Sequence, residues 1–230
     1  MNFRVLLVFY GAALTAEIFS HLTQNTGVQC VSKPALMLIL IFYFSANARK
    51  LISTKFLIIS ALFFSWLGDL FLLLDKIYKT YFIYGLTAFL AAHISYTVYF
   101  WQMRKINKIG KLPNALIFAG IAAYILIFFA FLSPNVQNLL IPLGIYGLVI
   151  SIMLGASLTS FEFRKNYFGK ICVAGTLLFV LSDSILAINR FVSPFKYALV
   201  LIMLTYAAAQ LLITEGSLRN LRAIEKASAK

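Results

Sequence analysis

Charged residues are scarce in this sequence, and acids are the scarcest. Only 12% of the 230 residues are charged, and Lys and Arg outnumber Asp and Glu by 20 to 7. By contrast, 62% are hydrophobic and the mean hydropathy is +0.90, far outside the range of soluble globular domains. The bases fall in short gaps between apolar runs, so the net charge of +13 suits lipid headgroups rather than nucleic acid.

Cysteine and histidine are also rare, with two of each. Cys30 and Cys172 are predicted on opposite sides of the membrane and cannot pair. We place His21 outside the spans, so one intramembrane histidine remains and a three-histidine zinc site cannot be assembled. The G-x-S-x-G and H-E-x-x-H motifs are also missing. We therefore expect no metal and no organic cofactor.

Long apolar segments make up most of the chain. A membrane-spanning helix needs about 20 largely apolar residues. Eight segments qualify: residues 3–21, 33–48, 55–74, 81–103, 113–131, 138–160, 171–190 and 196–215. The fold class predicted is an all-α integral membrane protein with eight transmembrane helices. Residues 1–216 form its membrane domain, and residues 217–230 form a basic cytoplasmic tail that we expect to lie as an interfacial helix.

The distribution of Lys and Arg predicts the orientation, because short cytoplasmic connections retain positive charge. One set of alternate connections and ends carries fifteen bases: Arg4, Arg49, Lys50, Lys55, Arg104, Lys105, Lys108, Lys111, Arg164, Lys165, Lys170, Arg219, Arg222, Lys226 and Lys230. The other set carries five: Lys33, Lys76, Lys79, Arg190 and Lys196. Both termini are therefore predicted to be cytoplasmic.

A few polar residues fall inside the predicted spans, where ionisable groups are costly and are functional candidates by default. At 1.5 Å per residue, Asp69 lies about 21 Å above Lys55 and Asp183 about 20 Å above Lys170, so the two share a layer. Tyr206 and His93 fall at similar depths. Helical spacing adds Ser65, Tyr96 and Gln210 to the same faces. The alternative is that these groups only hydrogen-bond across helices.

Two other residues lie near the outer surface. Lys33-Pro34 is predicted to open the second span, where Pro is tolerated in the first turn and Lys can reach lipid phosphate. Lys33 could therefore be an anchor or a ligand for a headgroup phosphate. Glu17 is expected to be hydrated at the end of the first span. We expect no Lys or Arg at the depth of Asp69 and Asp183, so neither carboxylate should have a cation partner.

Several short stretches together resemble the lysoplasmalogenase (YhhN-like) family of eight-span membrane proteins. The resemblance rests on the order and spacing of these stretches along the predicted spans. They are Ser32-Lys33-Pro34, Phe64-Ser65-Trp66-Leu67-Gly68-Asp69, Phe89-Leu90-Ala91-Ala92-His93-Ile94-Ser95-Tyr96, Leu181-Ser182-Asp183-Ser184-Ile185-Leu186-Ala187, and Tyr206 with Gln210.

The resemblance implies hydrolysis of the vinyl ether bond of lysoplasmalogens to a fatty aldehyde and glycerophosphocholine or glycerophosphoethanolamine. It implies a lysophospholipid substrate, Asp69 and Asp183 as catalytic residues, and a multi-pass protein of a bacterial inner (plasma) membrane. We assign substrate binding to Lys33, His93, Tyr96, Tyr206 and Gln210.

The residues support this chemistry independently of the resemblance. A vinyl ether is cleaved by protonation at carbon, and water then captures the oxocarbenium ion. Two carboxyl groups in unequal surroundings can divide the work, one neutral as the acid and one ionised. Two alternatives remain: a proton- or cation-coupled transporter, in which paired carboxylates bind the ion, and a non-catalytic lipid-binding protein.

Overall fold

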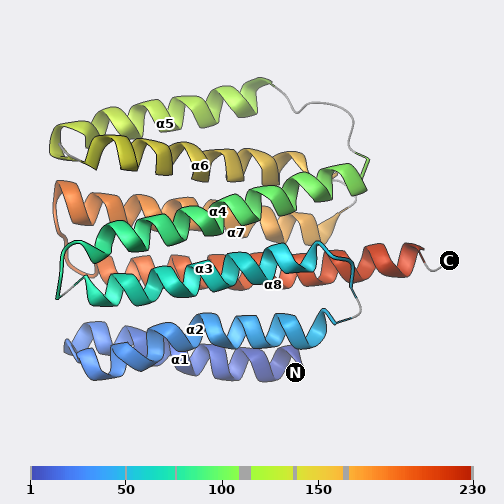
Figure 1. The fold of residues 1–230 in the computed structure, drawn as a ribbon, viewed down its shortest axis with the longest axis horizontal. Coiled ribbons are helices and arrows are strands. Elements are labelled where there is room, and N and C mark those ends of the chain that lie inside the picture. Colours follow the sequence, from blue (N-terminus) through green and yellow to red (C-terminus); the bar gives the residue numbers. More distant parts are fainter. Residues whose placement is uncertain are drawn as a thin grey trace.

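The computed structural model describes residues 2–49, 51–75, 77–108, 115–136, 139–162 and 166–228, and these residues form eight long helices. The helices lie side by side along the long axis of the molecule (Figure 1). The helix bounds are α1 Phe3–Thr23, α2 Thr26–Asn47, α3 Lys55–Leu74, α4 Tyr81–Ile106, α5 Ala115–Val136, α6 Leu140–Thr159, α7 Tyr167–Ala187 and α8 Ala198–Ser228. A π-helical turn, η2 Ile188–Val192, extends α7.

All eight helices contain a stretch long and apolar enough to cross a membrane. Many large apolar side chains point outward, where lipid would surround them; examples are Val8, Phe42, Leu126, Ile127 and Ile141. The predicted fold class is thus confirmed as an all-α, multi-pass membrane protein. Both termini lie at the same end of the bundle, as an even number of spans requires (Figure 1).

The helices form successive layers. At one edge α1 and α2 form a pair, α3, α4, α7 and α8 fill the centre, and α6 and then α5 form the other edge (Figure 1). The outermost helix, α5, contacts α6 and η2 and has only 6% of its most apolar window buried. It is therefore the helix with the least internal packing.

Two helix boundaries differ from the prediction. Helix α2 begins at Thr26 instead of Lys33, because Asn25 caps it by accepting the Val28 N–H at 3.1 Å. Pro34 consequently lies inside the helix rather than in its first turn. Helix α8 continues without a break to Ser228, and Ser217, Leu218 and Leu221 are buried. The start of the expected interfacial tail therefore continues the last helix and packs inside the bundle.

Small residues bring α7 and α8 together. A Cβ atom added at Gly175 would lie 2.9 Å from both the Ala209 carbonyl oxygen and the Ile213 nitrogen. One added at Gly216 would lie 2.7 Å from the Cys172 Sγ and 3.0 Å from the Phe168 carbonyl oxygen. Glycine at these positions therefore permits backbone contact between the two helices that carry Asp183 and Tyr206.

The predicted inner and outer faces depend partly on bases that lie outside the described residues, namely Lys50, Lys76, Lys111, Arg164, Lys165 and Lys230. The orientation in the membrane stays a prediction.

Candidate functional site

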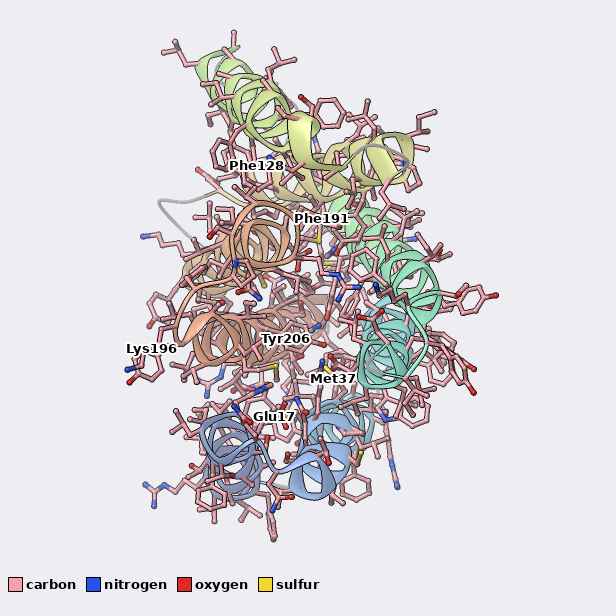
Figure 2. The ribbon with its side chains drawn as sticks, turned by 90° about the vertical axis from the view of Figure 1, so that its left-hand side faces the viewer. Glu17, Met37, Phe128, Phe191, Lys196 and Tyr206 are labelled. Carbon is pink, nitrogen blue, oxygen red and sulfur yellow. The ribbon has the colours of Figure 1, made fainter. Side chains whose placement is uncertain are left out.

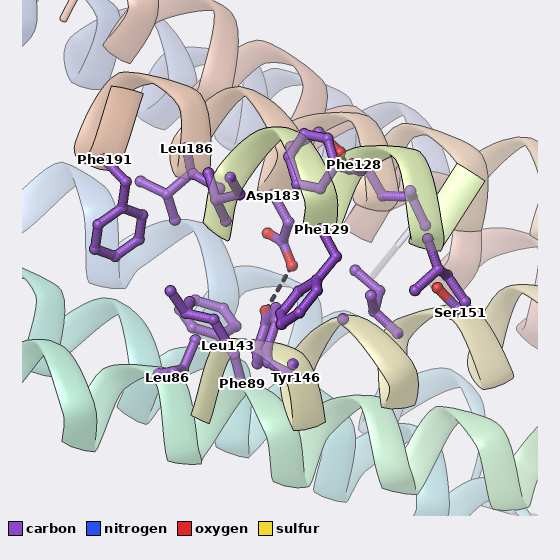
Figure 3. Close-up of a pocket in the computed structure, with 18 of the residues that line it drawn as sticks. Leu86, Phe89, Phe128, Phe129, Leu143, Tyr146, Ser151, Asp183, Leu186 and Phe191 are labelled. Carbon is purple, nitrogen blue, oxygen red and sulfur yellow. Dashed lines mark hydrogen bonds between the residues drawn. The ribbon is translucent and has the colours of Figure 1, made fainter. Parts of the chain in front are cut away.

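An apolar pocket lies between α4, α5, α6 and α7. It holds about 850 Å³ of empty space, part of it open to the surroundings. Figure 3 shows Phe128 and Phe129 of α5, Leu143 of α6 and Phe191 of η2 around Asp183. Asp183 is the only carboxylate among the described residues that line the pocket. A carboxyl group in such a lining can meet an apolar substrate away from bulk water.

Asp183 is held by two polar neighbours. The Tyr146 hydroxyl donates a hydrogen bond of 2.5 Å to its Oδ2 (Figure 3), and His93 Nε2 lies 3.3 Å from the same oxygen. His93 Nε2 is also 2.9 Å from the Tyr146 oxygen, so the three groups form a closed triangle. Within the part of the chain that the structure describes, these contacts all end on Oδ2, which leaves Oδ1 for contact with a substrate.

Asp69 has a different environment. It is 2% exposed, the Tyr206 hydroxyl donates to its Oδ2 at 2.8 Å, and Lys33 Nζ lies 3.7 Å from its Oδ1. The expectation that neither aspartate has a cation partner is therefore wrong for Asp69. Because α2 begins at Thr26, Lys33 lies inside the bundle next to α3 rather than at the outer surface. The ammonium group of Lys33 and the hydroxyl group of Tyr206 are thus the polar groups that hold the buried Asp69 carboxyl.

A second pair of residues joins α3 and α8 one turn away from Asp69 and Tyr206. Gln210 donates from Nε2 to Ser65 Oγ at 2.9 Å, and Tyr96 of α4 donates to Gln210 Oε1 at 2.6 Å. Because Ser65 and Asp69, like Tyr206 and Gln210, are four residues apart, each helix presents both groups on one face. These contacts between buried polar side chains orient the helices around Asp69.

Aromatic rings lie between the two carboxyl clusters. The Phe179 ring contacts His93 on one side, at 4.7 Å between centroids, and Tyr206 on the other, at 5.5 Å. Phe89 lines the pocket and also contacts the Tyr206 ring at 5.9 Å. The described side chains of Asp69 and Asp183 share no hydrogen bond. The single polar pocket expected from their common depth is thus divided into two clusters.

Glu17 extends the Asp69 side toward the C-terminal end of α1. It is fully buried and accepts hydrogen bonds from Ser32 Oγ at 2.6 Å and Gln29 Nε2 at 3.5 Å, and His21 Nε2 lies 3.1 Å from it. Figure 2 shows Glu17 on the inward side of the α1–α2 pair and Tyr206 deeper in the bundle. The expectation of a hydrated Glu17 is wrong, and His21, expected outside the spans, lies within α1.

Every residue predicted for the site therefore lies in one of the two clusters. His93 and Asp183 belong to the pocket side, and Lys33, Ser65, Asp69, Tyr96, Tyr206 and Gln210 belong to the other side. The sequence did not indicate Tyr146, because its span contains no acid or base to mark a functional face. The small residues Gly144 and Gly147, two positions before and one position after Tyr146, line the same pocket, and this clustering of small residues was the available signal.

The described residues contain no group of three or more His, Cys, Asp and Glu that could hold a metal ion. The two clusters instead contain hydroxyl, imidazole and carboxyl groups that contact each other. This set can transfer protons and stabilise charge without a metal.

Comparison with known proteins gives a consistent picture. The chain is 31% identical over 194 residues to Lysoplasmalogenase TMEM86B of Rattus norvegicus, covering 84% of this chain and 72% of the rat protein. It is 34% identical over 147 residues to the Homo sapiens protein of the same name, covering 63% of this chain and 57% of that protein. Lysoplasmalogenase TMEM86A of Bos taurus is 30% identical over 170 residues, covering 71% of this chain and 66% of the bovine protein.

No solved structure is significantly similar to the chain. The YhhN family model matches residues 28–217, which include both carboxyl clusters. With most of its length matched, the chain belongs to the YhhN family.

Proposed function

We propose that this protein is a membrane-embedded hydrolase that cleaves the vinyl ether bond of lysoplasmalogens, releasing a fatty aldehyde and a glycerophospho-headgroup. The observation that carries the proposal is the apolar pocket with Asp183 as its one described carboxylate. The relatives named as lysoplasmalogenases support the substrate class. A lysoplasmalogen has a single hydrocarbon chain and can reach the pocket directly from the membrane. We expect the protein in a bacterial plasma membrane.

The two carboxyl groups have surroundings that suit two roles. Asp69, next to Lys33 and Tyr206, is assigned the ionised state. Asp183 has no Lys or Arg partner among the described residues and lines the apolar pocket, where an apolar substrate can reach it. We assign the acid to Asp183 because it reaches the pocket, and the fixed negative charge to Asp69, which acts through the low-dielectric interior beyond Phe89.

Two proton transfers at Asp183 form a hemiacetal, and transfer of the hemiacetal hydroxyl proton to the ether oxygen then releases the products. Asp183 Oδ1 gives its proton to the second carbon of the alkenyl chain, and the positive charge moves to the first carbon and the ether oxygen. Tyr146 and His93 stabilise the carboxylate that forms on Asp183. Water adds to the first carbon while Asp183 takes up its proton, and the hemiacetal separates into aldehyde and the glycerol hydroxyl. One water is consumed and Asp183 is restored.

Purified protein in micelles provides the direct test. We expect aldehyde release from a lysoplasmalogen and none from the matching ester lysophospholipid. In deuterated water the aldehyde should carry deuterium on the carbon next to the carbonyl, because that carbon receives the proton. Asp183→Asn and Asp69→Asn should each fold yet lose at least about a hundredfold in kcat, the usual scale for a missing acid or base.

Three results would contradict the proposal. Near-normal kcat in both folded Asn variants would exclude the two-carboxyl mechanism even if aldehyde release were found. Transport of solute into sealed vesicles without any aldehyde release would instead support an ion-coupled carrier, whereas lipid binding without turnover would support a lipid-binding protein.

A further inference from the structure

A second and wider cavity lies next to the pocket, between α4, α5 and α6. This slot holds about 1800 Å³ of empty space, part of it open to the surroundings. Its walls are mostly apolar, with Trp101 and Phe118 among them, but one end carries Arg104, Lys105 and Lys108. The charged residues described in its lining are thus all basic. They belong to the end of the bundle predicted to be cytoplasmic.

The slot lies directly beside the pocket. Ser151 of α6 and Ile125 of α5 line both cavities, and Thr97, one turn beyond His93 on α4, lines the slot. Eleven residues separate His93 from Arg104, a rise of about 16–17 Å along the helix. Side chains of a helix lean toward its N-terminus, which for Arg104 is toward His93, so the long side chain shortens this gap.

We propose that the basic residues Arg104, Lys105 and Lys108 bind the headgroup phosphate of the substrate, which enters laterally between α4 and α5 from the predicted cytoplasmic leaflet. This inference rests on the proposed hydrolase function. The loose packing of α5 supports the route, because that helix can separate from α4 while disturbing little of the core. The vinyl ether then lies beside Asp183, between the phosphate and the end of the hydrocarbon chain.

The remaining part of the pocket suits the hydrocarbon chain. From Asp183 to Phe191 the helix rises about 12 Å, and the lining there includes Leu132, Leu143 and Phe191. One lipid chain spans about half of a hydrocarbon core of about 30 Å, or about 15 Å, which is a similar length. The reverse orientation would bury the phosphate among these apolar side chains and leave the chain end facing three cations.

Arg190 and Lys33 are two other described bases near the carboxyl clusters. Arg190, near the outer end of the pocket, forms an ion pair with Asp75 at 2.7 Å and lies over the Phe82 ring. Lys33 lies beside Asp69, on the far side of Phe89 and Phe179 from the pocket. The sequence-based prediction that Lys33 binds the phosphate is therefore the rival to test.

Kinetics distinguish these assignments. The triple variant Arg104→Gln, Lys105→Gln, Lys108→Gln should raise KM for lysoplasmalogen at least about tenfold with kcat changed only a fewfold, as expected for lost ground-state binding. Lys170→Gln is the matched control, because Lys170 is exposed at the same end of the bundle and lines neither cavity. For an alkenylglycerol without phosphate, KM should be the same in wild type and triple variant. An unchanged KM in the triple variant, with a raised KM in Lys33→Gln or Arg190→Gln, would overturn the proposal.

A binding experiment separates this proposal from the proposed reaction. The chain has two Trp residues, so Trp66→Phe leaves Trp101 in the slot as the reporter. A saturated alkyl ether lysophospholipid that cannot be hydrolysed, brominated near the ether end of its chain, should quench Trp101 saturably. Unbrominated lipid should compete for the site and reverse the quenching. The triple variant should bind the brominated lipid at least about tenfold more weakly, as measured by quenching, whereas Lys170→Gln should bind it as the wild type does.

The outcomes of the two experiments are distinct. Saturable quenching without aldehyde release would contradict the proposed reaction but support the phosphate site. Aldehyde release without saturable quenching, or with quenching that the triple variant leaves unchanged, would contradict the phosphate site but support the reaction.

Discussion

At the scale of single residues, Asp69 and Asp183 differ in their partners rather than in their depth. Asp69 has an ammonium group and a hydroxyl donor, whereas Asp183 has a hydroxyl, an imidazole and an apolar pocket. Environment rather than residue type is therefore the basis on which we propose one carboxyl as the anion and the other as the acid. Lys33 and Tyr146 are the neighbours whose removal tests this assignment.

Lys33→Met should lower kcat by about tenfold or more and change KM little. Removing the ammonium group leaves Asp69 buried without its cation, so its fixed negative charge is lost on protonation. The control is Lys79→Met, because Lys79 is exposed on the predicted outer side. Steady-state kinetics in micelles provide the measurement. A raised KM with unchanged kcat would show that Lys33 binds phosphate, as the sequence alone suggested.

Tyr146→Phe should lower kcat by about ten- to a hundredfold, the equivalent of a charged hydrogen bond of about 1.5–3 kcal/mol. The hydroxyl stabilises the Asp183 carboxylate that forms in the transition state, while the ring contact with His93 is retained. Tyr124→Phe is the matched control, since Tyr124 lines the same pocket but bonds to Ser184. Similar losses in both variants would contradict the special role of Tyr146.

At the scale of helices, the contact between α7 and α8 depends on residues without side chains. Gly175→Ala should destabilise the protein by about 1–3 kcal/mol, because the new methyl group would overlap backbone atoms of α8. Gly120→Ala on α5 should have no such effect, since no atom lies within 4 Å of the added Cβ. Thermal unfolding in detergent measures both. Equal melting temperatures for the two variants would show that α7 and α8 can move apart at little cost.

At the scale of the whole molecule, the bases predict the orientation. Reporter fusions after Lys108 should report a cytoplasmic location and fusions after Lys79 an external one, because short cytoplasmic connections retain Lys and Arg. Fusions at the C-terminus should agree with those after Lys108. An external reporter after Lys108 would reverse the orientation and place the entrance of the slot in the other leaflet.

The amino-acid sequence by itself determined the fold class and the helices. Apolar length alone located all eight helices, including the bounds of α3, since a spanning segment must satisfy its own backbone groups. The four-residue spacing of Ser65 and Asp69, and of Tyr206 and Gln210, also predicted shared faces correctly, because helical geometry is local. Helix ends were less predictable: the Asn25 cap and the buried start of the tail depend on contacts with neighbouring helices.

Only the tertiary structure decided which polar groups meet. Depth along a helix does not fix the direction in which a side chain points, so two aspartates in one layer belong to separate clusters with Phe179 between them. The pairing of Lys33 with Asp69 and of Tyr146 with Asp183 joins residues 36 and 37 positions apart on different helices. Such contacts arise from how helices rotate and pack against each other, and packing is a property of the whole bundle.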